Sequence, residues 1–365
     1  MIKSLHNDER KWYNIFNSYY NLKIRELYKK EIKYPFNPIY VGLKITEKCN
    51  QRCKHCWSGK SSFEPSYEQI EKAIQKIKSF DIYHFTITGG EPFLREDCFD
   101  IIELAKRNFP VVEVFTNAEL LTSKDIDKLS LILGKDDFLQ VSLDGLEQTY
   151  KAQRGVDGYE KVIKNVELLI KKGINVRVHM TVSKYNESDI FPVYKKCLLL
   201  DCHTFSITFV YPLRKGCIIR DETSFDIYEQ SIKNISNHHN AGNYKMFIRP
   251  FVPIEIQSKY ARYKVNKDFI FFNENILHWV IDANGEIYNF MDHIKHKDLR
   301  IGNIYNDDIE TIKKTNLNVQ RKILFRNLNN EKCSKCSLLD SCHGGNYIDN
   351  YPDMNKPDRR CKADV

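Results

Sequence analysis

Strand-like and helix-like segments alternate along residues 40–236, and this alternation is the feature that most constrains the fold. Short apolar, β-branched runs predict strands, and apolar residues three and four positions apart predict helices. Strands that alternate with helices form parallel sheets of βαβ units. The predicted strands cover residues 40–46, 83–88, 111–116, 138–143, 175–182 and 203–210, and the predicted helices cover residues 66–80, 97–108, 124–133, 158–172, 190–200 and 225–236.

These repeated units predict an α/β fold, a partial (β/α)6 barrel, because a closed barrel of this type needs about eight units. From about residue 245 the pattern changes: residues 279–282 and 286–290 flank Ala283-Asn284-Gly285, which predicts a β-hairpin before a Cys-rich tail. We therefore expect an N-terminal helical segment at 1–38, a barrel at 39–244 and a hairpin with a Cys-rich module at 245–365. The N-terminal helix is expected to pack across the barrel opening, with partner binding as the alternative.

Composition narrows the class of protein. Hydrophobic residues make up 42% and charged residues 28% of the 365 residues, as in globular proteins. No apolar run reaches the roughly 20 residues that span a bilayer, and residues 1–10 lack the apolar core of a signal peptide. We expect a cytoplasmic protein with no membrane partner. We attribute the net charge of +8 to lysines on solvated helix faces and expect no nucleic-acid partner. A basic groove that binds an acidic peptide is the alternative.

Eleven cysteines indicate metal binding, since the cytosol reduces disulfides. Cys49, Cys53 and Cys56 have the spacing Cys-x3-Cys-x2-Cys and follow the first predicted strand directly. Structural zinc and ordinary iron–sulfur clusters take four protein ligands, whereas three are local here. A cubane held by three cysteines leaves one iron open to a ligand that is not protein, as catalysis needs. The alternative is zinc with His55 as the fourth ligand.

With this cysteine loop, residues 39–215 resemble the radical S-adenosylmethionine (SAM) family, whose signature is Cys-x3-Cys-x2-Cys after the first strand. The resemblance implies a [4Fe-4S] cluster that binds SAM and cleaves it reductively to a 5′-deoxyadenosyl radical, which abstracts a substrate hydrogen atom. It also implies a flavodoxin- or ferredoxin-type electron donor. The family often has an aromatic residue before the third cysteine. Here His55 takes that place and Trp57 is adjacent, and either ring is expected near the adenine.

Further motifs at strand ends match the family's SAM site. Gly89-Gly90-Glu91-Pro92 ends the second predicted strand: its glycines admit a close ligand, and Glu91 offers a carboxylate to an ammonium group. By the resemblance, Ser142 and Arg154 bind the SAM carboxylate, and a guanidinium suits that task through paired donors. Asn117, after the third strand, is a further candidate. The alternatives are a surface ion pair for Arg154 and a turn or helix cap for Asn117.

The tail carries a second group of cysteines, Cys333, Cys336, Cys342 and Cys361. Four thiolates make a closed set for one iron–sulfur cluster or for a structural zinc, and spacing leaves the two open. The tail resembles the SPASM extension of radical SAM enzymes that mature peptides and sulfatases, which implies iron–sulfur.

The full SPASM module has seven cysteines and two auxiliary clusters, and this chain departs from it in an ordered way. Phe290 and Asn346 stand where the module has cysteines. The missing ligands are those of the inner auxiliary cluster, and the remaining four match the outer one. We therefore expect two [4Fe-4S] clusters in all, one at the SAM site and one auxiliary. Substrate oxidation would then use a longer electron path, or the chemistry would be redox-neutral.

The other cysteines are assigned mostly to packing. Cys98, Cys197 and Cys202 are expected to be buried, since free cysteine packs as a small hydrophobe. Cys217 follows the sixth predicted strand on the expected site side. Its thiol is the one catalytic candidate, because a thiol at this place is able to return a hydrogen atom to a substrate radical, as an epimerase requires.

Two enzyme functions and one other function follow from these features. The first is a radical SAM oxidoreductase or peptide-modifying enzyme that acts on a ribosomal peptide or protein. The second is a dehydrogenase, epimerase or mutase of the same family acting on a small molecule such as an aminosugar, nucleoside or tetrapyrrole. The third, an iron–sulfur electron carrier without catalysis, conflicts with the SAM motifs.

Overall fold

One mixed β-sheet organises the part of the chain that this computed structural model describes, which is residues 37–58, 63–211, 215–242, 244–251, 278–324, 331–336 and 356. The predicted helical segment at 1–38 lies outside these residues except for its last two positions. Neighbouring strands follow the order β10-β9-β8-β1-β2-β3-β4-β5-β6-β7. The strands are β1 (Tyr40–Thr46), β2 (His84–Gly89), β3 (Val111–Thr116), β4 (Phe138–Ser142), β5 (Val176–Val182), β6 (Thr204–Phe209), β7 (Phe247–Phe251), β8 (His278–Ile281), β9 (Glu286–Tyr288) and β10 (Arg300–Asn303).

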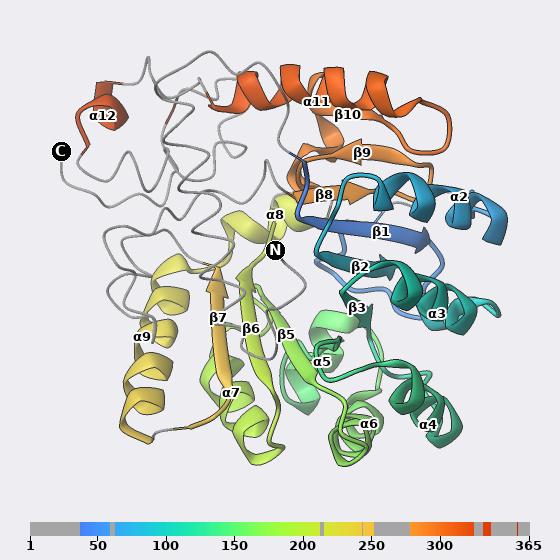
Figure 1. Ribbon diagram of the computed structural model, residues 1–365. Coiled ribbons are helices and arrows are strands. Elements are labelled where there is room, and N and C mark those ends of the chain that lie inside the picture. Colours follow the sequence, from blue (N-terminus) through green and yellow to red (C-terminus); the bar gives the residue numbers. More distant parts are fainter. Residues whose placement is uncertain are drawn as a thin grey trace.

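The six predicted strands and the helices that follow them are confirmed, and they form a parallel partial barrel with the helices outside (Figure 1). Local sequence sets the helix starts: Ser66 and Gln69 form a capping box before α2, and Thr122 and Asp125 form another before α4. The helices are α2 (Tyr67–Lys78), α3 (Cys98–Asn108), α4 (Ser123–Ile132), α5 (Glu147–Arg154), α6 (Tyr159–Lys171), α7 (Ile190–Leu199), α8 (Gly216–Asp221), α9 (Phe225–Gly242), α11 (Ile309–Leu324) and α12 (Glu331–Ser334).

Two features extend the sheet beyond the prediction. Strand β7 pairs parallel to β6, although it lies past residue 244, where the barrel was expected to end. The hairpin of β8 and β9 forms where it was predicted, around Asp282–Gly285, and β8 joins the barrel by pairing parallel to β1. The C-terminal hairpin is thus continuous with the barrel sheet. The domain boundary near residue 245 stays a prediction.

The buried side of the sheet faces the helices. Along β5, Val176, Val178, Met180 and Val182 are all fully buried in the core. Equivalent positions of the neighbouring strands are also apolar, so burial of this face stabilises the layer of helices on the sheet. The alternate positions along the same strands face the interior of the partial barrel, where the candidate site lies.

Lys76 joins helix α2 to the C-terminal part of the chain. Its Nζ atom donates to the carbonyl oxygens of Ile304 at 2.8 Å, Tyr305 at 3.3 Å and Asp307 at 2.9 Å. We expect Lys76→Met to lower the free energy of unfolding by about 2 kcal/mol, because hydrogen bonds to a charged group contribute about 1.5–3 kcal/mol. Urea unfolding measures the loss. Lys72→Met on the exposed face of the same helix is the control, and equal stability of the two variants would contradict the prediction.

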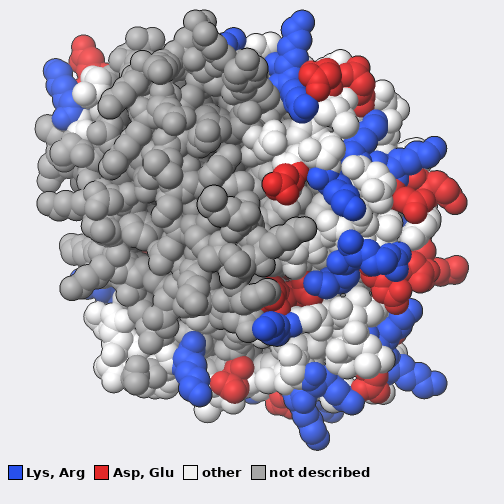
Figure 2. Space-filling view, viewed as in Figure 1, with Lys and Arg blue, Asp and Glu red and all other residues white. Residues whose placement is uncertain are grey.

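Charged side chains on the described surface are mixed in sign. Figure 2 shows Lys and Arg interspersed with Asp and Glu, and exposed pairs such as Lys48–Glu64 at 2.6 Å and Lys151–Asp157 at 2.7 Å account for part of this pattern. On this face the positive charge is spread among carboxylates, as expected for solvated helix faces. Among the helices of the described ranges, none has both the length and the apolar character that a membrane-spanning helix needs.

Candidate active site

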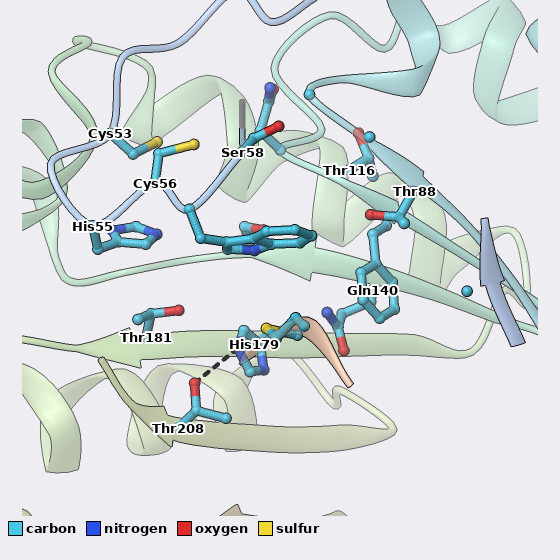
Figure 3. Close-up of a pocket in the computed structure, with 18 of the residues that line it drawn as sticks. Cys53, His55, Cys56, Ser58, Thr88, Thr116, Gln140, His179, Thr181 and Thr208 are labelled. Carbon is cyan, nitrogen blue, oxygen red and sulfur yellow. Dashed lines mark hydrogen bonds between the residues drawn. The ribbon is translucent and has the colours of Figure 1, made fainter. Parts of the chain in front are cut away.

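A cavity of about 960 Å³ fills the interior of the partial barrel. Its walls are the inward-facing side chains of β1 to β8 together with the loop that follows β1 and carries Cys49, Cys53 and Cys56. Figure 3 shows Cys53 and Cys56 on this loop beside the space that Gln140 and His179 enter from β4 and β5. The volume is at the upper end of the range of ligand pockets, which leaves room for more than one small group.

The inner wall of the barrel is polar, and the sequence analysis did not identify it. Arg177, His179 and Thr181 line the cavity from β5, and Ser206 and Thr208 line it from β6. His179 interacts with both hydroxyls, each at 3.2 Å: Nδ1 with Ser206, and Nε2 with Thr208, the contact drawn in Figure 3. Burial lowers the pKa of His179 to about 4. Parallel strands covered on both faces are normally apolar throughout. The strict alternation of polar and apolar residues along β5 and β6 was therefore the sequence signal that could have indicated a solvated interior.

The cysteine loop is anchored on two sides. Lys54 N donates to Gln153 O at 2.9 Å, and Gln51 Nε2 donates to Tyr150 Oη at 3.2 Å, so helix α5 fixes one side. Gln51 Nε2 also donates to Glu119 at 2.9 Å, which ties the loop to the end of β3. The anchors hold the three thiols at one mouth of the cavity.

The three thiols differ in exposure. Cys49 is exposed, Cys56 is half-buried and Cys53 is buried; all three are free and line the cavity. Burial raises the pKa of Cys53 to about 11, although Arg154 opposes the rise, and burial raises that of Cys49. Within the described residues, no group of three or more His, Cys, Asp or Glu side chains is already gathered around one point. The assignment of Cys49, Cys53 and Cys56 as cluster ligands stays a proposal.

Gly89 and Gly90 allow two backbones to approach each other. Both line the cavity, but a Cβ atom on Gly90 would lie well inside van der Waals contact with the carbonyl oxygen of Lys48. Gly90 N donates to Thr46 O and Glu91 N donates to Lys48 O, both at 2.8 Å. The glycines therefore seat the cysteine loop against β2, and the expected approach of a ligand to their backbone stays a prediction.

We expect Gly90→Ala to lower the free energy of unfolding by about 1–3 kcal/mol, because the added methyl group displaces the backbone at Lys48. Urea unfolding measures the effect. Gly42→Ala is the matched control, since a Cβ atom there makes only ordinary contact with Trp279 O at 3.9 Å. A Gly90→Ala variant as stable as the control would show that the contact is unimportant.

Glu91 is a buried structural carboxylate. Its Oε1 accepts from Thr116 Oγ1 at 2.7 Å and Phe93 N at 3.3 Å, and its Oε2 accepts from Asn117 N at 2.7 Å. Burial raises its pKa to about 7 in spite of these donors. Glu91 is not among the cavity-lining residues, and Pro92 is buried in the short turn that Glu91 caps. This placement moves the proposed contact with an ammonium group from the Glu91 side chain to the cavity-lining backbone at Gly89 and Gly90.

Asn117 and Ser142 both line the cavity at strand ends. Asn117 Oδ1 accepts from Glu119 N at 2.9 Å, and its Nδ2 donates to Asn50 Oδ1 at 2.8 Å. The bond from Glu119 N is typical of an asparagine in a turn, which was the alternative reading of Asn117. The bond to Asn50 ties Asn117 to the cysteine loop. Ser142 is the last residue of β4 and is half-buried.

Arg154 is part of a buried network and not of a surface ion pair. Its Nε donates to Asp144 Oδ2 at 2.8 Å and its Nη1 donates to Gln51 Oε1 at 2.7 Å, and only 6% of the residue is exposed. Asp144 also accepts from Thr181 N at 2.7 Å, and Arg154 holds the pKa of this carboxyl below its usual range against the effect of burial. A guanidinium has five N–H donors, so donors remain for a ligand in the cavity.

His55 and Trp57 also face the cavity. His55 Nε2 lies 3.6 Å from Asp144 Oδ2, its Nδ1 is buried without a hydrogen-bond partner, and burial lowers its pKa. Lys44 Nζ lies 4.5 Å from the centre of the Trp57 ring. Both rings line the cavity, and the expected contact of either ring with adenine stays a proposal.

The tail site lies only partly within the described residues. Cys333 is buried in α12, Cys336 is half-buried after it, and Cys336 N donates to Cys333 O at 3.1 Å. Cys342, Cys361 and Asn346 lie outside the described residues. Cys217 belongs to α8, but its side chain is also outside the description. Phe290, which replaces a module cysteine, lines the cavity with its ring 6.0 Å from that of Tyr211.

These residues fit an iron–sulfur centre with three protein ligands. Three free thiols open from one anchored loop into a large cavity, and the buried Nδ1 of His55 is left without a protein partner. Soft thiolate donors select iron–sulfur clusters or zinc. The buried Arg154 beside the loop supplies positive charge for an anionic ligand group.

Comparisons with known proteins agree with this site. Residues 43–197 match the family model described as the radical SAM superfamily. The pre-heme d1 synthase of Dinoroseobacter shibae is 30% identical over 158 residues, which are 42% of this chain and 39% of that protein. The antilisterial bacteriocin subtilosin biosynthesis protein AlbA of Bacillus subtilis is 25% identical over 224 residues, which are 57% and 50%. The chain therefore spans half or less of the length of these two relatives.

The fold has solved counterparts. The crystal structure of Streptococcus suis SuiB bound to its precursor peptide SuiA superimposes with a TM-score of 0.76 at 16% identity and covers 99% of this chain and 82% of that one. At this identity the similarity shows the fold alone.

Proposed function

Because residues 43–197 match the family model of the radical SAM superfamily, we propose that this chain modifies a ribosomal peptide or protein by radical chemistry. The observation that carries the proposal is the loop of Cys49, Cys53 and Cys56, which opens into the polar cavity beside Arg154. In this proposal the three cysteines hold a [4Fe-4S] cluster. When bound, the cluster and SAM would supply a one-electron reductive cleavage of the sulfonium bond, which gives methionine and a 5′-deoxyadenosyl radical; that radical would become 5′-deoxyadenosine by taking a hydrogen atom from the substrate.

The chain's own residues orient SAM in this proposal. Arg154, fixed through Asp144 and Gln51, presents its remaining donors to a carboxylate, and Ser142 lines the same cavity from the end of β4. The cavity-lining backbone of Gly89 and Gly90 offers carbonyl oxygens to the ammonium group. Glu91 is a positioning residue, because its carboxylate fixes the end of β3 next to that backbone.

We expect Arg154→Gln to weaken SAM binding about tenfold or more, because charge-assisted hydrogen bonds contribute about 1.5–3 kcal/mol. Isothermal titration of the reconstituted protein with SAM measures the dissociation constant. Arg52→Gln is the matched control, since Arg52 lies on the cysteine loop, lines the same cavity as Arg154 and is exposed. Equal affinities of the two variants would contradict the role of Arg154.

A second, auxiliary cluster completes the proposal. Its ligands are Cys333, Cys336, Cys342 and Cys361, of which the first two lie three residues apart at α12. Phe290 lines the cavity at a position where the full module carries a cysteine, which supports the absence of an inner auxiliary cluster. Cys217 as the hydrogen donor to a substrate radical stays a prediction.

A peptide substrate is favoured over a small molecule by two similarities. AlbA is a bacteriocin biosynthesis protein by name, and SuiB shares the fold and was crystallised with a precursor peptide. The mouth of the cavity carries basic side chains, Arg52 and Lys215, that suit an acidic peptide. The pre-heme d1 synthase similarity supports the second candidate, a small-molecule substrate.

Co-expression tests the substrate class. The chain is produced anaerobically with each short peptide encoded beside its gene, and the peptides are analysed by mass spectrometry. We expect a mass change in one peptide that is lost when Cys49, Cys53 and Cys56 are replaced by alanine. Unchanged peptides, together with SAM cleavage by the same protein, would reject the peptide substrate and favour a small molecule.

A further inference from the structure

The carboxamide of Gln140 projects from β4 into the cavity and has no role in the proposed SAM site (Figure 3). Only 8% of the residue is exposed. Within the described part of the chain, neither Oε1 nor Nε2 of Gln140 has a hydrogen-bond partner, and both atoms are open to the cavity. Because buried polar groups are almost always hydrogen-bonded, a carboxamide left open in a cavity wall is a candidate contact for a ligand.

A second open group lies next to this carboxamide. His179 is two residues beyond Arg177, the register partner of Gln140, so the Cα atoms of Gln140 and His179 are roughly 8 Å apart on one face of the sheet. The His179 ring is neutral at pH 7, because burial lowers its pKa to about 4. A neutral imidazole donates from one nitrogen and accepts at the other, so only one of the Ser206 and Thr208 hydroxyls gives its proton to the ring. The other hydroxyl keeps an O–H donor at the cavity wall.

The charged residues of the same wall interact with one another. Glu113 Oε1 accepts from Arg177 Nη1, and although burial raises the pKa of Glu113, the charges of Arg177 and Arg249 are among the effects that lower it. The open carboxamide and the open hydroxyl, in contrast, carry no charge. Together they offer donors and acceptors in close proximity, which suits an uncharged polar group that itself has both.

We propose that Gln140 is a specificity-determining residue that binds a carboxamide side chain, asparagine or glutamine, of the substrate peptide. This inference rests on the proposed peptide substrate and adds to it the chemical class of one residue. A primary carboxamide presents an N–H and a C=O on the same edge, so two such groups pair through two N–H···O bonds. The bound carboxamide keeps a further N–H and a free carbonyl lone pair, and the open hydroxyl beside His179 is able to bond to either.

A side chain suits the depth of Gln140 better than a main chain does. Gln140 is the middle residue of β4, and Ser142 at the end of that strand lies roughly 7 Å nearer the mouth. The cysteine loop and the proposed SAM site are at the mouth. A single side chain reaches down the wall from a peptide held at the mouth, whereas a main chain at this depth would have to enter and leave past SAM.

Three small probes test this site in the reconstituted full-length protein, with SAM present, without reductant and under anaerobic conditions. N-acetylglutamine N-methylamide carries the carboxamide. The corresponding glutamate compound has the same shape with a charge, and the corresponding leucine compound has the same main-chain amides without a polar side chain. Ligand-observed NMR titration gives the three dissociation constants. We expect the glutamine probe to bind about fivefold or more tightly than the other two, because its side chain alone offers both a donor and an acceptor to Gln140.

Three results would overturn the inference. Equal binding of the glutamine and leucine probes would assign the binding to main-chain amides or to apolar contacts. A glutamate probe that binds as tightly as the glutamine probe, or more tightly, would assign the wall to an anion. Binding of none of the probes would show that water alone satisfies the Gln140 carboxamide.

Variants locate the discrimination. Gln140→Leu replaces the carboxamide by an apolar group of similar size, and we expect it to remove the preference for the glutamine probe while the affinity for SAM is unchanged. Thr88→Val is the matched control, because half-buried Thr88 lines the same cavity from β2, and this variant should keep the preference. An equal loss of preference in both variants would overturn the inference, since it would indicate a general effect of polarity. A loss of SAM affinity in Gln140→Leu would also overturn it, since it would assign Gln140 to SAM.

The two proposals fail in distinguishable ways. If the wild-type protein prefers the glutamine probe but modifies none of the co-expressed peptides, the carboxamide site stands and the peptide substrate falls. If a peptide is modified while the three probes bind equally, the proposed function stands and the carboxamide site falls.

Discussion

Replacing Cys49, Cys53 and Cys56 together by alanine will reduce the iron content of the reconstituted protein from about eight to about four per chain. The physical reason is that these three thiols are the only protein donors proposed for the cluster at the cavity mouth, whereas the tail cysteines form a separate closed set. Iron and sulfide analysis with electronic absorption measures the loss. The same variant is expected to release no 5′-deoxyadenosine.

Two controls make this result specific. Cys98→Ala removes a fully buried thiol of α3 that does not line the cavity, and it should retain all of the iron. Replacing Cys333 and Cys336 should also leave about four irons per chain, and these irons would belong to the cluster at the cavity mouth. About twelve irons in the wild type would contradict the account of two clusters, as would complete loss of iron in the first variant.

Replacing Glu113 by glutamine will lower the free energy of unfolding at neutral pH by about 3 kcal/mol or more. The carboxylate is completely buried, and removal of its charge leaves the Arg177 guanidinium buried without its counter-charge, which costs about 3–5 kcal/mol. Urea unfolding of metal-free wild type and variant, followed by tryptophan fluorescence, measures the difference. Glu103→Gln removes an exposed carboxylate 3.8 Å from Arg107 and should change stability by less than about 0.5 kcal/mol.

The same carboxylate predicts a pH dependence with a definite sign. Although burial raises the pKa of Glu113, Arg177 and His84 oppose it strongly and lower the value from 4.5 to about 2. Because the pKa is lower in the folded state, the stabilisation is fully present above about pH 4.5 and is lost as the pH falls toward 2. The stability of wild type and Glu113→Gln should therefore converge on acidification. A difference that stays constant below pH 4.5 would contradict the assignment.

Most of the barrel was predictable because its signals are local. Ile70, Ala73, Ile74 and Ile77 repeat at helical spacing and are all buried in α2, whose start follows from the capping box at Ser66. Helix α5 was not predicted, because few of its residues are apolar and its burial comes from Tyr150, Gln153 and Arg154. Its position depends on bonds to the cysteine loop, which are long-range contacts.

The candidate site was predictable in its residues but less so in their roles. The cysteine loop, which follows β1, and Arg154, the last residue of α5, line one cavity. Glu91 belongs to the expected motif, but its carboxylate accepts hydrogen bonds from Thr116 and Asn117 at the end of β3. Without this carboxylate those buried donors would be unpaired. The inner polar wall was signalled by the polar–apolar alternation of β5 and β6, whereas the pairing of Glu113 with Arg177 across strands is a long-range contact that this alternation does not reveal.

The central claim, that this cavity supports radical SAM chemistry, is tested most directly by product analysis. The protein is reconstituted anaerobically with iron and sulfide, reduced with dithionite and given SAM, and 5′-deoxyadenosine is measured by mass spectrometry. The account predicts 5′-deoxyadenosine from the wild type and none from the variant in which Cys49, Cys53 and Cys56 are alanine. A wild-type protein that holds its iron–sulfur clusters yet releases no 5′-deoxyadenosine, even with candidate peptides present, would contradict it.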